Sequence, residues 1–272
     1  MTRSVRRTRR ILQMTSTGAA ALLTLSACSG SGSSDASGKA GDAASAKLSG
    51  TVTVFAAASL QESFTTLGKE FEKQHPGTRV SFNFGGSDTL AANITGGAPA
   101  DVFAAASPKT MKIVTDTKDT AGTPATFARN QLEIATVPGN PHKVASLKDL
   151  TKSGLKVVLC DSSVPCGAAA QKALSVGKVM LTPVSYEQDV KGALTKVELK
   201  EADAALVYRT DVRAAGDKVE GVEFPESAEA VNNYPIALLK NGQNARAAKA
   251  FIALIRSGVG QRVLSGDGFL EP

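Results

Sequence analysis

The stretch TVTVFAAASLQESFTTLGKEFEKQHPGTRVSFNF, residues 51–84, contains the unit that decides the fold. Its first five residues are rich in β-branched and aromatic side chains, which predicts a strand. Leu60, Phe64, Leu67 and Phe71 then recur every three or four residues, as on one face of a helix. The triplet HPG ends this helix, and apolar residues alternate again to the end of the stretch. The order strand, helix, strand predicts a βαβ unit with parallel strands.

The start of this helix also carries a capping signal. Ser59 precedes the periodic residues and Glu62 follows three positions later, which is the spacing of a capping box. We therefore expect the Ser59 side chain to cap the helix.

The alternation of strands and helices continues along the chain. It predicts an α/β architecture with parallel-rich sheets covered by helices on both sides. The further strands expected lie at 101–103, 131–137, 155–160, 205–208 and 234–239, and the further helices at 88–94, 167–175, 187–199 and 244–257.

The N-terminus accounts for the basic character of the chain. The formal net charge is +6, but the first 27 residues hold five arginines and no acidic residue. The other 26 basic residues are balanced by 25 acidic ones, so the rest of the chain is nearly neutral. The basic charge therefore gives no reason to expect a nucleic-acid partner.

Residues 1–27 have the features of a bacterial lipoprotein signal peptide. A basic segment at 3–10 precedes an apolar stretch at 18–27, which is too short to remain as a membrane-spanning helix. It ends in LSAC, which places the lipid-accepting thiol at Cys28. Residues 28–47 are rich in Ser, Gly and Ala and predict a flexible linker after the lipid. We expect a lipid-anchored protein on the extracytoplasmic face of the cell membrane, exported by the general secretory or the twin-arginine route.

An oxidising compartment changes how the remaining cysteines are interpreted. With Cys28 lipidated, Cys160 and Cys166 form an even pair six residues apart. They form either a disulfide that closes a short loop or two free thiols. A zinc site is not expected, because His75 and His142 show no ligand spacing with these cysteines.

Recognisable catalytic motifs are missing from the sequence. It contains no G-x-S-x-G, no Walker loop, no H-E-x-x-H and no G-x-G-x-x-G. The sequence therefore favours a non-enzymatic protein, and no catalytic residue is assigned.

Small polar residues stand instead at the starts of predicted helices. Ser59, Ser87 and the triplet PCG at 165–167 follow predicted strands, and the segment EQDV at 187–190 starts another predicted helix. Helix starts carry free backbone N–H groups and a positive partial charge, so they bind oxyanions without lysine or arginine. The alternative is purely structural, since a serine at such a position is usually only a cap.

At these residues the chain resembles the periplasmic molybdate-binding proteins of ABC transporters. The resemblance runs from about Leu48 to the C-terminus. It is carried by VFAAASL at 54–60, FGGSDTL at 84–90, GAPADVF at 97–103, VPCG at 164–167, DVKGAL at 189–194 and LVY at 206–208.

The resemblance implies a two-lobed periplasmic binding protein of type II, with the ligand cleft between the lobes. One lobe would comprise residues 48–130 and 235–272, and the other residues 131–234. The lobes are expected to close on the ligand about a hinge.

The resemblance also implies the ligand contacts. The first lobe would supply hydroxyl groups and the second lobe backbone N–H groups and a phenol. Two departures from the family pattern stand out: a cysteine replaces the more frequent alanine at 166, and Gly85–Gly86 replaces a more serine-rich turn. The implied residues are the hydroxyls of Ser59 and Ser87, the N–H groups of Cys166 and Val190, and the Tyr208 phenol.

Such a site suits molybdate or tungstate, bound through their oxygens without direct coordination of the metal. Either anion is a fully deprotonated acceptor, and a pocket of donors satisfies all its oxygens. No cofactor is expected, and the partners are an ABC permease and the membrane, with the protein acting as a monomer. The alternatives are another anion in the same fold, such as sulfate, phosphate, a carboxylate or chelated iron, or an exported enzyme or cell-surface module.

Overall fold

The computed structural model describes residues 47–272. The predicted signal peptide (1–27), the predicted lipidation site Cys28 and all but the last residue of the predicted linker (28–47) lie outside the described residues. None of the helices in the described part is long and apolar enough to span a membrane.

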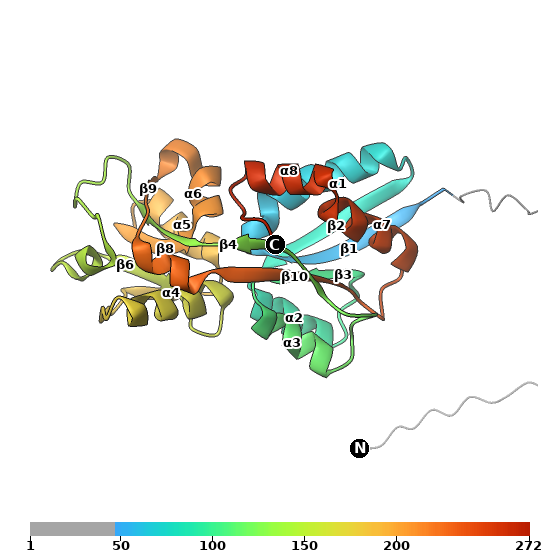
Figure 1. Ribbon diagram of the computed structural model, residues 1–272, viewed down its shortest axis with the longest axis horizontal. Coiled ribbons are helices and arrows are strands. Elements are labelled where there is room, and N and C mark those ends of the chain that lie inside the picture. The colour runs from blue at the N-terminus through green and yellow to red at the C-terminus, as the bar shows by residue number, and fades with distance from the viewer. Residues whose placement is uncertain (1–46) are drawn as a thin grey trace, which may run out of the picture. The chain divides into compact units, whose positions relative to one another are not determined.

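Two five-stranded sheets form the cores of two lobes (Figure 1). The first sheet has the strand order β2 (Thr78–Gly85), β1 (Gly50–Ala57), β3 (Val102–Ala104), β10 (Asn232–Leu238) and β4 (Ala125–Asn130). The second has the order β7 (Ser185–Glu187), β6 (Val157–Cys160), β8 (Ala204–Tyr208), β5 (Leu132–Thr136) and β9 (Glu220–Val222).

Helices cover the sheets of both lobes (Figure 1). The first lobe contains α1 (Gln61–Gln74), α2 (Ser87–Thr95), α3 (Pro108–Asp116), α7 (Ala245–Arg256) and α8 (Gly258–Gly266). The second lobe contains α4 (Pro165–Val176), α5 (Val190–Glu198) and α6 (Arg209–Ala215). Short 3₁₀ turns lie at η1 (Ala58–Leu60), η2 (Leu147–Thr151), η3 (Gly216–Lys218) and η4 (Pro225–Ala230).

The βαβ unit expected from the opening stretch is present. Strands β1 and β2 pair in parallel, with Val54 opposite Phe82, and α1 connects them. The side chains of β1 alternate between two cores: Val54 packs with α1, α7 and α8, whereas Phe55 packs with α2 and α3. Strand β1 is therefore buried on both faces, which explains its apolar sequence from Val54 to Ala57.

The predicted capping box is wrong. Ser59 lies inside the turn η1, and the N-cap position of α1 belongs to Leu60, with no side-chain cap. The Ser59 hydroxyl instead lies 2.9 Å from the hydroxyl of Tyr234 in β10. The Ser59 side chain therefore makes a contact with β10 instead of capping α1.

The structure also corrects several element predictions. The helix predicted from residue 187 begins at Val190, because Glu187 pairs with Cys160 as the end of β7. Strand β10 runs antiparallel to both β3 and β4, and β5 runs antiparallel to β8 and β9, so the sheets are mixed. The elements β4, β7, β9, α3, α6 and α8 were not predicted, since their apolar patterns are short.

The chain passes between the lobes twice. It leaves the first sheet after Asn130 at the end of β4 and returns at Asn232, where β10 begins. These two residues are paired in the antiparallel ladder, so the crossings lie side by side. Two adjacent crossings form a narrow connection, which is the arrangement expected of a hinge.

Candidate functional site

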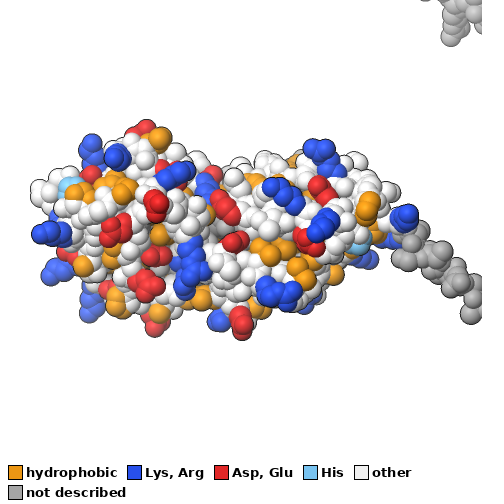
Figure 2. Space-filling view, turned by 90° about the horizontal axis from the view of Figure 1, so that it is seen from above, with side chains coloured by type: hydrophobic (Ala, Val, Ile, Leu, Met, Phe, Trp, Pro, Cys, Tyr) orange, Lys and Arg blue, Asp and Glu red, His pale blue; other side chains and the backbone are white. Residues whose placement is uncertain are grey.

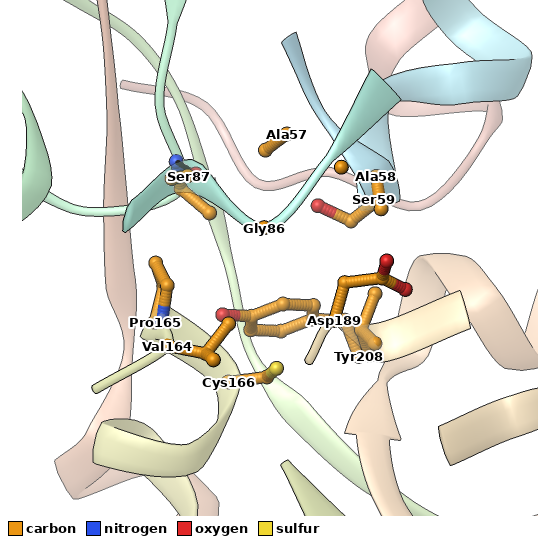
Figure 3. Close-up of a pocket in the computed structure, with 13 residues that line it drawn as sticks. Ala57, Ala58, Ser59, Gly86, Ser87, Val164, Pro165, Cys166, Asp189 and Tyr208 are labelled. Atoms are coloured by element: carbon orange, nitrogen blue, oxygen red, sulfur yellow. Dashed lines mark hydrogen bonds between the residues drawn. The ribbon is translucent and has the colours of Figure 1, made fainter. Parts of the chain in front are cut away.

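A small buried pocket lies between the lobes, and all five predicted ligand residues line it (Figure 3). Their side chains are between 1% and 4% exposed. The cavity volume is only about 10 Å³, close to the space for one water molecule. The lobes are therefore closed on the pocket. The five residues are Ser59, Ser87, Cys166, Val190 and Tyr208.

The first lobe contributes two serine hydroxyls. Ser59 lies in the turn that follows β1, and Ser87 is the first residue of α2. The Ser87 Oγ accepts a hydrogen bond of 3.0 Å from the backbone N–H of Ala106. Both serines therefore lie at the carboxyl ends of parallel strands, where ligands of α/β sheets usually bind.

The second lobe presents the first turns of two helices. Pro165 is the first residue of α4 and has no N–H, so Cys166 carries the first N–H group of that helix. Asp189 caps α5, and its Oδ1 accepts a hydrogen bond of 2.9 Å from Gly192 N–H. That cap leaves the Val190 N–H without an intrahelical acceptor, because helix starts lack a preceding turn.

A disulfide joins the end of β6 to the first turn of α4. It links Cys160 to Cys166, whose Cα atoms lie 5.8 Å apart. Cys166 is a pocket residue, so the bond attaches the N-terminus of α4 to the sheet of its own lobe. The disulfide fixes the backbone position of Cys166 relative to β6, and it leaves neither of these two cysteines as a free thiol at the pocket.

The described residues that line the pocket include no basic side chain. Their one charged member is Asp189, whose carboxylate already caps α5. The N-termini of α2, α4 and α5 supply the positive potential, because the peptide dipoles of each helix point that end at the cavity. On the surface shown in Figure 2, basic and acidic side chains are interspersed.

Gly86 has a role that the sequence did not indicate. A Cβ atom at this position would lie 2.5 Å from the backbone oxygen of Gln188 in the opposite lobe. The absence of a side chain thus permits the two lobes to meet. In the Gly85–Gly86 turn, which replaces a more serine-rich turn of the family, Gly86 is therefore a point of interlobe contact.

A second interlobe contact lies beside the pocket. Lys191 Nζ lies 2.9 Å from Glu62 Oε1 in α1 and 3.2 Å from Asp211 Oδ1 in α6. Asp211 is fully buried, and its Oδ2 accepts a hydrogen bond of 3.1 Å from Tyr208 N–H. Burial raises the pKa of Asp211 to about 6, although the neighbouring Lys191 ammonium opposes the increase.

This raised pKa predicts a pH dependence of stability. Between the ordinary pKa of 3.8 and the folded value of about 6, the folded protein retains a proton that the unfolded chain has released. The free energy of unfolding should therefore decrease as the pH rises through this range. Asp211→Asn should remove this contribution, measured as a change in the slope of melting temperature against pH. The exposed Asp217→Asn is the matched control, and parallel curves for wild type and Asp211→Asn would contradict the prediction.

The chain matches a family model along most of its length. The model describes a bacterial extracellular solute-binding protein and covers residues 52–270. The chain belongs to the bacterial extracellular solute-binding proteins. Members of this family are transport components, so the solute-binding protein described here is not an enzyme.

Known relatives agree with this membership. The molybdate-binding protein ModA of Mycobacterium tuberculosis is 44% identical over 222 residues, which cover 82% of this chain and 85% of the relative. The periplasmic molybdate-binding protein of Azotobacter vinelandii shares the fold, with a TM-score of 0.70, 20% identity and coverage of 81% and 99% of the two chains. The sulfate-binding protein SubI of Mycobacterium tuberculosis superposes equally well, with a TM-score of 0.71, 16% identity and coverage of 80% and 86%. The fold of this solute-binding protein therefore does not select the anion.

Proposed function

We propose that this protein captures molybdate or tungstate outside the cytoplasm and delivers it to an ABC importer. The observation that carries the proposal is the convergence of hydroxyl and backbone donors from both lobes on one closed pocket without a basic side chain. The identity of 44% to a molybdate-binding relative supports the choice of anion.

The proposed contacts direct five donors at the four oxygens of the anion, each of which can accept more than one hydrogen bond. Ser59 and Ser87 bind the anion from the first lobe, and the N–H groups of Cys166 and Val190 bind it from the second. The Tyr208 phenol completes the set. A tetrahedral dianion such as molybdate carries only acceptors, so it can use every one of these donors at once.

Selection against other anions follows from protonation and size. A hydrogen phosphate anion carries a proton that requires an acceptor, whereas all five proposed contacts are donors, and the one carboxylate of the lining, Asp189, is already used to cap α5. Sulfate has the charge and shape of molybdate but shorter bonds, so it would leave some donors without a partner. Molybdate and tungstate differ too little in size to be separated by these contacts.

The anion is cargo and not a cofactor, and no residue of the protein performs chemistry on it. Closing of the lobes on the anion would create the form that a membrane permease recognises. We further propose that a lipid on Cys28 tethers the monomeric protein to the extracytoplasmic face of the membrane, with residues 28–47 as the linker.

Thermal unfolding of residues 47–272 with separate oxyanions tests the function. At a thousandfold excess over a micromolar Kd, molybdate or tungstate should stabilise the fold by about 4 kcal/mol, a shift of several degrees. Because the chain has no tryptophan, a dye or calorimetry must report the transition. Sulfate and phosphate should produce no comparable shift. A shift with sulfate alone would reassign the ligand, and no shift with any of the four would reject an oxyanion function.

A further inference from the structure

Each hydroxyl of the pocket receives a hydrogen bond from a group behind it. For Ser87 the donor is the backbone N–H of Ala106. The groups behind Tyr208 and Ser59 are Asn232 and Tyr234 of β10, and Tyr234 is in turn bound by Asn130 of β4. A hydroxyl whose oxygen accepts from behind keeps its own proton available for the pocket.

The first such donor is Asn232, which opens β10. Its Nδ2 lies 2.6 Å from the Tyr208 hydroxyl and 3.3 Å from the backbone oxygen of Pro165. A carbonyl oxygen can only accept, so the group that faces Pro165 must be the amide nitrogen. Asn232 therefore donates to Tyr208, and the phenol proton is directed elsewhere.

Asn130, at the end of β4, acts on Ser59 through Tyr234. Its Oδ1 accepts a hydrogen bond of 3.0 Å from Gln131 N–H, which fixes the orientation of the amide. Its Nδ2 then donates to Thr210 Oγ1 at 2.9 Å and to the Tyr234 hydroxyl at 3.3 Å. The Tyr234 hydroxyl lies 2.9 Å from Ser59 Oγ. Because Tyr234 already accepts from Asn130, we assign Tyr234 as the donor of this bond.

We propose that Asn232 and Asn130 are positioning residues that hold Tyr208 and Ser59 as hydrogen-bond donors to the bound anion, and so set the preference for a fully deprotonated oxyanion. The two asparagines face each other in the β4–β10 ladder. One pair on the crossing strands thus orients hydroxyls of both lobes. This inference rests on the proposed oxyanion function and extends it to the residues that determine selectivity.

The phenols are suited to this role. Tyr208 and Tyr234 are fully buried, and burial raises the pKa of each above its usual value. They therefore remain protonated donors at any pH at which the protein works.

A double-mutant cycle between Asn232 and Tyr208 tests the inference by calorimetric titration with molybdate. Asn232→Leu should weaken binding by roughly 10-fold, since it frees the Tyr208 proton to turn away from the anion. In the Tyr208→Phe background the same change should cost almost nothing, because no phenol remains to be oriented. Asn233→Leu is the matched control: it is the next residue of the same strand, it is exposed, and it should leave affinity unchanged.

Asn232→Asp provides a second measurement, the preference for molybdate over phosphate. A loss of folding would reduce both affinities and would not change this preference. The introduced carboxylate would accept the Tyr208 proton and turn a phenol lone pair toward the pocket, where hydrogen phosphate can donate to it. The added charge repels both anions alike. The ratio of the affinities for molybdate and phosphate therefore measures the effect of the new acceptor in the pocket. The preference for molybdate over phosphate should fall by roughly 10-fold.

Two results would overturn this inference and leave the proposed function standing. One is an equal loss of molybdate affinity on Asn232→Leu in the wild-type and Tyr208→Phe backgrounds. The other is an unchanged ratio of molybdate to phosphate affinity in Asn232→Asp. If the unmodified protein binds no oxyanion, the proposed function fails first and the inference fails with it. The wild-type titration therefore distinguishes the two failures.

Discussion

Removing both serine hydroxyls, by Ser59→Ala combined with Ser87→Ala, is expected to weaken molybdate binding by at least about 100-fold. In the proposed site each hydroxyl donates to a doubly charged anion in a buried pocket, where hydrogen bonds to charged groups contribute most. Each single substitution should cost roughly 10-fold or more. The dissociation constant from calorimetric titration is the measurement.

Ser63→Ala supplies the matched control for these serines. Ser63 is also buried in the first lobe, but its hydroxyl donates to the carboxylate of Asp267, away from the pocket. Its replacement should lower the melting temperature and leave the affinity unchanged. Equal losses of affinity for Ser63→Ala and Ser87→Ala would show that the serines act through stability and do not contact the anion.

Gly86→Ala is expected to weaken molybdate binding by roughly 10- to 100-fold, by preventing the lobes from meeting. The added Cβ would lie 2.5 Å from the backbone oxygen of Gln188 in the other lobe, and a backbone atom cannot rotate out of the way. Its other close neighbour, Asp88 Oδ1 at 2.8 Å in its own lobe, is the end of a side chain that can rotate away. The backbone of Gly86 has φ −59° and ψ 130°, which any residue can adopt. The first lobe should therefore fold normally, and the unliganded melting temperature should stay close to that of the wild type.

The test combines titration with small-angle X-ray scattering. The wild type should become more compact when molybdate is added, whereas Gly86→Ala should not. Gly85→Ala is the comparison variant, because its Cβ would meet only the Leu90 side chain at 3.9 Å. Full compaction of Gly86→Ala with undiminished affinity would refute the role of this glycine in closure.

Most of the elements around the pocket could be predicted because their signals are local. The helical spacing from Leu60 to Phe71 and the alternation up to Phe84 gave the βαβ unit, and both strands pair as expected. The predictions failed where an element is short or is formed by pairing. Residues 185–187 carry no strand pattern of their own, and become β7 only because β6 lies beside them.

The five pocket residues were predicted mainly from their resemblance to a known family, with helix-start chemistry as the physical reason. Their neighbours were not predicted. Asn130 and Asn232 look like loop residues in the sequence, and nothing in their local context points to Tyr234 or Tyr208. Their positions behind the hydroxyls depend on two strands that are far apart in the chain and paired in the hinge.

The sequence by itself determined the alternation of strands and helices, the near-neutral charge after the first 27 residues, and the polar groups at helix starts, because each depends on residues within a few positions of one another. Only the tertiary structure decided what those groups contact. Ser59 carries a capping signal, yet its hydroxyl bonds to Tyr234, 175 residues away. Gly86 and Lys191 acquire their contacts across the lobes in the same way. Such contacts depend on how the lobes close, and no local pattern of residues encodes them.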